Sequence, residues 1–193
     1  MNALICLSGG LDSTVLAYDL VSRGAHLESI SFDYGQSHKR ELDAAREISE
    51  LLGIKHRILD FSKAVPSGGS SLTGGEGSPV VPNRNGTMLT LAVTYAAGIG
   101  AEKVFYGPTK EDHKVFPDCR REFVDSFNEM LKISECEITV HAPFLNLEKG
   151  DVVLIGKGLD VPFEKTWSCY VGGEDPCGKC SACISRKKAL SCT

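Results

Sequence analysis

The apolar run at residues 3–7 passes directly into a glycine-rich stretch, Ser8-Gly9-Gly10-Leu11-Asp12-Ser13-Thr14, and this junction constrains the fold more than any other part of the chain. The apolar run predicts a strand, and the residues after the glycines predict the start of a helix. Gly9 and Gly10 lack side chains, so a phosphate could approach the backbone N–H groups at the positive end of that helix. The junction therefore predicts a strand, a phosphate-binding loop and a helix. An ordinary strand-to-helix turn is the simpler alternative.

The polar side chains of this loop suit phosphate chemistry. Ser8, Ser13 and Thr14 offer hydroxyl donors, and Asp12 can cap the helix or hold a magnesium ion against phosphates. The loop lacks the Gly-Lys-Ser/Thr ending of a Walker loop. We therefore expect no lysine in place to reach a terminal phosphate, which argues against kinase-like or GTPase-like transfer.

Strand and helix patterns alternate after the loop. Residues 27–32 predict a second strand, residues 38–52 carry apolar side chains at helical spacing, and residues 55–61 predict a third strand. A β-α-β-α-β order requires a parallel sheet with right-handed crossovers and helices on both faces. Ligands of such sheets bind at the carboxyl ends of the strands, where the glycine loop lies.

The rest of the chain continues the α/β pattern after an interruption. The segment from Ser62 to Pro82 is rich in glycine and serine, so we expect a mobile loop or lid that is too polar to pack. The later elements are expected as a helix from Asn85, a strand at 103–106, a helix capped by Asp118, a strand at 138–140 and a helix at 148–158. These elements predict a doubly wound, five-stranded parallel sheet in residues 1–160, followed by a small segment at 161–193.

Four cysteines stand close together in that final segment. Cys169, Cys177, Cys180 and Cys183 supply the thiolate quartet of a closed tetrahedral zinc site, which would hold structure rather than perform chemistry. A four-iron cluster is the main rival, but the usual Cys-x-x-x-Cys-Pro continuation is absent. The same cysteines could also form disulfides or simply pack as buried thiols.

Composition narrows the compartment and the partners. The formal net charge of −4 over 193 residues gives no broad basic surface, so we expect no nucleic-acid partner. The apolar start is too short for a signal peptide, and we expect a cytoplasmic protein without a membrane partner. In a reducing compartment, the remaining cysteines are expected as free thiols: Cys6, Cys119, Cys136 and Cys192.

Several motifs together resemble a known family. Ser8-Gly9-Gly10-Leu11-Asp12-Ser13 resembles the pyrophosphate-binding loop of the N-type ATP pyrophosphatases, whose fold is adenine nucleotide alpha hydrolase-like and Rossmann-like. Within that superfamily the chain is similar to the 7-cyano-7-deazaguanine synthases. That similarity rests on Asp33-Tyr34-Gly35-Gln36 with His38 and Glu41, on Val81-Pro82-Asn83-Arg84-Asn85, on Phe116-Pro117-Asp118-Cys119-Arg120, on Ser168-Cys169-Tyr170, and on the cysteine cluster through Arg186.

The resemblance implies an ATP-dependent carbon–nitrogen ligase of queuosine biosynthesis. Such an enzyme adenylylates 7-carboxy-7-deazaguanine, captures it with ammonia as an amide, and adenylylates the amide to reach the nitrile, 7-cyano-7-deazaguanine (preQ(0)). AMP and pyrophosphate are released. The implied cofactors are Mg²⁺ with ATP and one structural Zn²⁺ per chain, the implied partners are small molecules, and a homodimer is expected.

The resemblance also assigns residues. Ser8, Asp12 and Ser13 are the expected catalytic residues. ATP binding is expected at Leu7, Ser8, Gly9, Gly10, Leu11, Asp12, Ser13, Thr14, Val15, Phe32 and Tyr34. Phe32 and Tyr34 could stack on adenine or pack the sheet. Substrate binding is expected at Arg84, Asn85, Asp118 and Arg120, where Arg84 offers a guanidinium fork for a carboxylate.

Three further functions stay open. The chain departs from the family at 62–82 and at Gly107-Pro108-Thr109-Lys110, so a variant that stops at the amide and feeds DNA modification is one alternative. A related ATP pyrophosphatase that modifies transfer RNA is the second, although its chemistry needs an RNA-binding surface and a cysteine near the loop. A zinc-ribbon interaction module on an inert α/β domain is the third.

Overall fold

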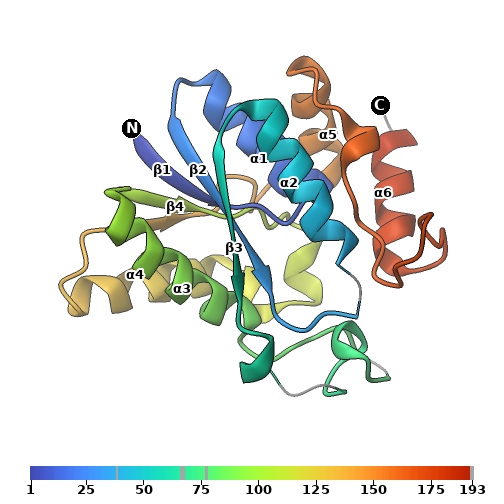
Figure 1. The fold of residues 1–193 in the computed structure, drawn as a ribbon, viewed down its shortest axis with the longest axis horizontal. Helices are drawn as coiled ribbons and strands as arrows, with labels where there is room; N and C mark the ends of the chain where they lie inside the picture. Colours follow the sequence, from blue (N-terminus) through green and yellow to red (C-terminus); the bar gives the residue numbers. More distant parts are fainter. Residues whose placement is uncertain (38, 66–67, 77, 192–193) are drawn as a thin grey trace.

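The computed structural model describes residues 1–37, 39–65, 68–76 and 78–191. A parallel sheet forms its centre, with the strand order β3-β2-β1-β4-β5 (Figure 1). The strands are β1 (Asn2–Cys6), β2 (His26–Asp33), β3 (Lys55–Asp60), β4 (Lys103–Phe105) and β5 (Thr139–His141). The predicted five-stranded parallel sheet is confirmed. His38 and Cys192 lie outside the described residues.

Helices cover both faces of the sheet, as the doubly wound pattern predicts (Figure 1). They are α1 (Leu11–Ser22), α2 (Arg40–Leu52), α3 (Arg84–Ile99), α4 (Arg121–Ile133), α5 (Lys149–Gly158) and α6 (Ser181–Ser191). Side chains alternate along β1: Ala3 and Ile5 join the core under α1, α2 and α5, whereas Leu4 joins the core under α3 and α4. Within the described ranges, no helix is long and apolar enough to cross a membrane.

The order of the strands sets the place of the ligand site. The chain runs from β1 through β2 to β3 at one edge and then returns to the other side of β1 with β4. The segments that follow β1 and β4 therefore diverge at the carboxyl end of the sheet, which is the switch point where such folds bind ligands. Gly107 follows β4, and a Cβ there would lie 3.3 Å from the Ser13 backbone nitrogen, so this segment borders the glycine loop.

The segment from Ser62 to Pro82 is more ordered than its composition predicts. It contains two 3₁₀ turns, Ser62–Ala64 and Ser71–Thr73. The Ser70 hydroxyl accepts a hydrogen bond from the Leu72 N–H at 3.0 Å, and Leu72 is only 5% exposed. The expectation that the segment is too polar to pack is wrong at 70–73, because one leucine anchors it and local side-chain hydrogen bonds satisfy its backbone.

Helix α5 packs closely on α1 through Gly156. A Cβ at this position would lie 2.5 Å from Phe163 Cζ and 2.7 Å from Val15 Cγ2, and Val15 is fully buried. Gly158, two residues further along the same helix, has no atom within 4 Å of its Cβ position. Alanine at Gly156 would therefore change both packing and helix propensity, whereas alanine at Gly158 would change helix propensity alone.

We predict that Gly156→Ala lowers the free energy of unfolding by about 1–3 kcal/mol, because overpacking outweighs the better helix propensity of alanine. Gly158→Ala is the matched control and should be neutral or slightly stabilising. Urea unfolding of the two variants beside the wild type checks this prediction. Equal effects at both positions would contradict the close packing of α5 on α1.

Candidate functional site

The loop between β1 and α1 is held in a tight conformation. Gly9 has a φ of +71°, and a Cβ there would lie 2.3 Å from the Glu41 carbonyl oxygen, so only glycine fits. The Ser8 and Ser13 hydroxyl oxygens lie 2.9 Å apart, and the Gly10 N–H donates to Ser8 Oγ at 3.2 Å. Gly10 is the N-cap of α1 and no side chain caps the helix, so Asp12 does not serve as its cap. The backbone N–H groups at this end of α1 can therefore serve an anion.

A lysine does lie at this loop. Lys149, the first residue of α5, places its Nζ 3.0 Å from Asp12 Oδ2, and both side chains are less than one-fifth exposed. We expected no lysine in place to reach a terminal phosphate because the loop itself contains none; Lys149 reaches Asp12 from α5, which is distant in sequence. Burial raises the pKa of Asp12 to about 6 even beside the Lys149 ammonium.

The acidic groups around Asp12 fit a divalent cation. Asp12 Oδ1 and Glu111 Oε2 are buried oxygens without a hydrogen-bond partner in the described chain. Asp112 also faces Asp12, and its Oδ2 accepts hydrogen bonds from Thr109 N and Thr109 Oγ1 at 2.8 and 2.9 Å. Carboxylate oxygens are the protein ligands that Mg²⁺ prefers, and Asp12, whose Oδ1 is unpartnered, lines the pocket together with Asp112.

A single pocket joins this loop to two of the four residues expected to bind substrate, Arg84 and Asn85. Among the residues predicted from the sequence, those that line it are Leu7, Ser8, Gly10, Asp12, Ser13, Phe32, Tyr34, Arg84 and Asn85. Gly9, Leu11, Thr14 and Val15 are buried behind the loop. The pocket is further lined by Glu41, Leu72, Tyr106, Asp112, Phe116 and Tyr170, which sequence reasoning did not assign to binding.

Two aromatic rings hold Arg84 in the lining of the pocket. Its guanidinium carbon lies 5.3 Å from the Tyr34 ring centroid and 5.8 Å from that of Phe116, and its Nη1 donates to Tyr34 Oη at 3.2 Å. In the described chain, Arg84 forms no ion pair with a carboxylate. The guanidinium is therefore oriented and still free to bind an anionic group. Phe32 packs edge-on against Phe61 at 6.0 Å.

Asp118 and Arg120 lie outside the lining of the pocket. Asp118 Oδ2 accepts a hydrogen bond from the Asn85 backbone N–H at 3.0 Å, so it satisfies the first turn of α3. The prediction that Asp118 caps the helix after it is wrong, because Arg120 is the N-cap residue of α4. Arg120 is exposed, and its Nε donates to the His113 carbonyl at 3.1 Å.

Glu41 is a pocket residue whose chemistry the sequence did not reveal. It stands in the first turn of α2, and its Oε1 accepts a hydrogen bond from Gln36 Nε2 at 2.9 Å. Burial raises the pKa of Glu41 to about 7. The motif Asp33-Tyr34-Gly35-Gln36 with Glu41 contains this contact, so the motif was the signal that could have assigned the residue.

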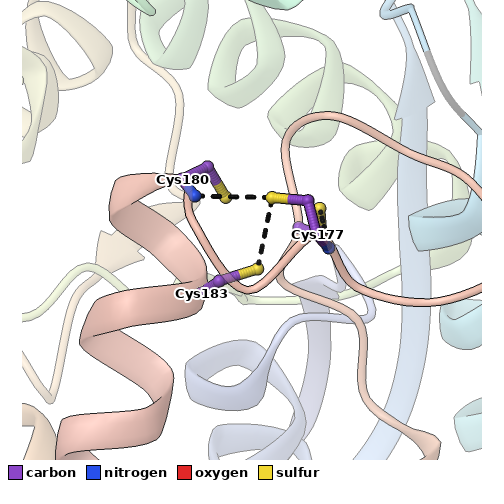
Figure 2. A group of neighbouring side chains, drawn as sticks. Cys177, Cys180 and Cys183 are labelled. Carbon is purple, nitrogen blue, oxygen red and sulfur yellow. Dashed lines mark hydrogen bonds between the residues drawn. The ribbon is translucent and has the colours of Figure 1, made fainter.

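The cysteine cluster forms one compact group at the start of α6. The sulfurs of Cys169, Cys177, Cys180 and Cys183 all lie within 4.8 Å of one another, and Figure 2 shows the last three pointing toward one another. Backbone N–H groups of Lys179 and Cys180 lower the pKa of Cys177 to about 6. Thiolates around a tetrahedral zinc, at Zn–S distances of about 2.3 Å, would lie about 3.8 Å apart, so this group can close on one ion.

The cysteine segment also touches the glycine loop. The Trp167 N–H donates to the Gly9 carbonyl at 2.8 Å, and Tyr170 lines the pocket. Arg186 of α6 donates from Nη1 to Thr166 Oγ1 at 2.5 Å. Arg40 stacks on Trp167, with its guanidinium carbon 5.2 Å from the ring centroid. The cysteine cluster is therefore connected through direct contacts to the glycine loop.

Solved structures share this architecture. A 4-thiouridine synthetase–RNA complex with bound ATP aligns at a TM-score of 0.57 and 18% identity over 98% of this chain and 50% of its own. NMN synthetase from Francisella tularensis aligns at 0.55 and 19% over 91% and 70%. U34-tRNA thiolase NcsA from Methanococcus maripaludis, with its [4Fe-4S] cluster, aligns at 0.57 and 15% over 99% and 65%. These identities show the fold alone.

The protein is of the α/β class, with a glycine loop that lines a pocket at the switch point of a parallel sheet. Residues 2–193 match the family "Queuosine biosynthesis protein QueC", and the chain belongs to that family. The 7-cyano-7-deazaguanine synthase of Caldicellulosiruptor saccharolyticus is 41% identical over 98% of this chain and 91% of its own length. That of Methanoregula boonei is 40% identical over 98% and 94%.

We predict that Lys149→Met lowers stability more at pH 8 than at pH 5. At pH 8, above its pKa of about 6, the wild-type Asp12 is ionised beside Lys149, and the variant must either bury that charge without its partner or protonate it; at pH 5 Asp12 is already largely protonated and little is lost. Breaking a buried pair costs about 3–5 kcal/mol, and for this partly enclosed pair we expect about 1–3 kcal/mol at pH 8. Lys157→Met on the same helix is the control, because Lys157 is exposed. Thermal unfolding at both pH values checks this; equal losses would contradict it.

Proposed function

We propose that this protein converts 7-carboxy-7-deazaguanine, ammonia and ATP into 7-cyano-7-deazaguanine, with release of AMP and pyrophosphate. The single observation that carries the proposal is the pocket that joins the glycine loop to the oriented, unpaired Arg84. The names of relatives about 40% identical over almost the whole chain support the same reaction. They favour neither the amide-stage variant nor the transfer RNA-modifying enzyme.

The phosphate end of the pocket suits cleavage between the α and β phosphates of ATP. The Ser8 and Ser13 hydroxyls and the N–H groups of the loop would donate to the departing pyrophosphate. Lys149 adds a positive charge that Asp12 keeps in place. Asp12 and Asp112 would hold Mg²⁺, which supplies charge neutralisation to the polyphosphate.

The other end suits a flat, carboxylated base. Arg84 offers two parallel N–H donors to a carboxylate, and Tyr34 and Phe116 fix the plane of its guanidinium. Asn85 lines the pocket beside it and can both donate and accept hydrogen bonds. In this proposal Asp118 acts on substrate indirectly, through the Asn85 backbone that it holds.

For the cysteine cluster we propose one structural Zn²⁺ per chain. Four thiolates leave no open coordination position, and an isolated turn with few apolar residues needs such a centre to fold. Residues 161–193 would then form the metal-holding segment beside an ATP domain at 1–160. We further propose a cytoplasmic homodimer that acts on small molecules, which the net charge of −4 supports over a nucleic-acid partner.

The reaction is tested by incubating the protein with ATP, 7-carboxy-7-deazaguanine and ammonium at pH 7.5. We expect AMP rather than ADP, and mass spectrometry should follow acid, amide and nitrile in turn. Arg84→Ala should raise the KM for the acid about 10-fold to 100-fold, because it removes a charge-assisted contact, while the melting temperature stays nearly unchanged. Accumulation of the amide as the final product, or formation of ADP, would contradict the proposal.

The metal is tested by elemental analysis and by Cys180→Ala. We expect one zinc per chain and no visible absorbance, and we expect the variant to lose both zinc and folded yield. Its melting temperature should fall by roughly 10 °C or more, at about 2–4 °C per kcal/mol for a chain of this length. Cys136→Ala, which removes a thiol outside the cluster, is the control. A brown protein with stoichiometric iron would replace zinc with the iron–sulfur alternative.

A further inference from the structure

Glu41 lines the pocket next to the glycine loop and has Arg84 as an electrostatic neighbour. It stands in the first turn of α2, and its own carbonyl oxygen packs against Gly9 of the loop. Its side chain lines the same pocket as Ser8 and Arg84. In the proposed reaction, the carboxylate of the substrate and the α-phosphate of ATP must meet between these two residues. Glu41 therefore borders the place where the acyl adenylate forms.

Among the described residues, one carboxylate oxygen of Glu41 has a hydrogen-bond partner and the other has none. The Gln36 side chain, which is 5% exposed, donates from Nε2 to Glu41 Oε1 at 2.9 Å. The Tyr34 backbone N–H in turn donates to Gln36 Oε1 at 2.9 Å and so orients the amide. Within residues 1–37, 39–65, 68–76 and 78–191, Oε2 of Glu41 has no hydrogen-bond partner. A carboxylate oriented through one oxygen, with the other open to a pocket, can receive a proton from a bound molecule.

The surroundings of Glu41 set its affinity for a proton near neutrality. Burial raises its pKa to about 7; Arg84 of α3 and the Gln36 amide lower it, and Asp33 of β2 raises it. The remaining titratable neighbour is the Tyr34 phenol, whose pKa burial raises to about 12, so it stays neutral. A base is most effective when its pKa lies close to the working pH.

We propose that Glu41 is the general base for ammonia in the amide-forming step, an assignment that rests on the proposed function. As the nitrogen lone pair forms the C–N bond to the acyl adenylate, one N–H proton passes to Glu41. The C–O bond to AMP then breaks, and its electron pair leaves on the phosphate oxygen. The products are the amide, AMP and a protonated Glu41, which returns its proton to water.

Two measurements separate this step from the one before it. Exchange of labelled pyrophosphate into ATP, dependent on 7-carboxy-7-deazaguanine and without ammonia, reports formation of the acyl adenylate alone. Amide formation from ammonia reports the capture step. Hydroxylamine provides a third measurement, because it is a stronger nucleophile and its adduct has a more acidic N–H, so its capture depends less on a base.

Glu41→Gln is the test variant, because glutamine keeps an acceptor for Gln36 but cannot take a proton. We expect it to retain exchange, to lose amide formation from ammonia by about 10²-fold, and to recover product as the hydroxamate when hydroxylamine is supplied. Rates of amide formation are divided by the concentration of unprotonated ammonia at each pH. The corrected rate of the wild type should then fall below a pH near 7, and that of the variant should not show this fall. Glu50→Gln, an exposed residue of the same helix, is the matched control and should match the wild type.

Folding is followed separately. Because burial disfavours the charged form of Glu41, Glu41→Gln should melt no lower than the wild type at pH 8. If it fails to fold, Glu41→Asp takes its place; it should lose amide formation partly and keep hydroxamate formation. Normal use of ammonia by Glu41→Gln, or equal loss of exchange, ammonia use and hydroxamate formation, would overturn the assignment. Absence of exchange in the wild type would instead overturn the proposed function.

Discussion

The rest of the site depends on the close contact at Gly9. Its φ of +71° and the 2.3 Å between its Cβ position and the Glu41 carbonyl let α2 approach the loop so closely that Glu41 enters the pocket. On its other side, the Gly9 carbonyl accepts the Trp167 N–H at 2.8 Å. One residue without a side chain thus sets the loop, the second helix and the start of the cysteine segment against one another.

The hydrogen bond from the Trp167 N–H to the Gly9 carbonyl links the cysteine cluster to the glycine loop. Trp167 is two residues before Cys169, and Tyr170 follows that cysteine into the pocket lining. Closing the cluster on an ion would fix the direction in which the chain leaves Trp167, and hence the position of the Gly9 carbonyl. In the proposed function, a closed four-cysteine site would support catalysis indirectly, by holding the glycine loop in shape.

The sequence predicted what local patterns encode. The glycine loop, the alternation of strands and helices, and the cysteine spacing each depend on neighbouring residues, and the structure has all three. The sequence did not predict the position of Lys149, because that position depends on how α5 packs on α1. The close packing at Gly156 permits this arrangement, and no local sequence pattern shows it. Asp118 was assigned to the wrong helix for the same reason: a capping side chain can serve a helix that is distant in sequence.

The two raised carboxyl pKa values divide the pocket into two chemical halves. Asp12 faces Lys149, Asp112 and Glu111, so a bound cation and phosphates would hold it ionised and make it a ligand. Arg84 is the positive neighbour of Glu41 among the described residues, and a substrate carboxylate that pairs with Arg84 would weaken that influence and raise the proton affinity of Glu41 further. Substrate binding would thus lower the pKa of Asp12 and raise the pKa of Glu41. The same pocket can then hold a permanent anion beside the polyphosphate and a proton acceptor beside the acyl carbon.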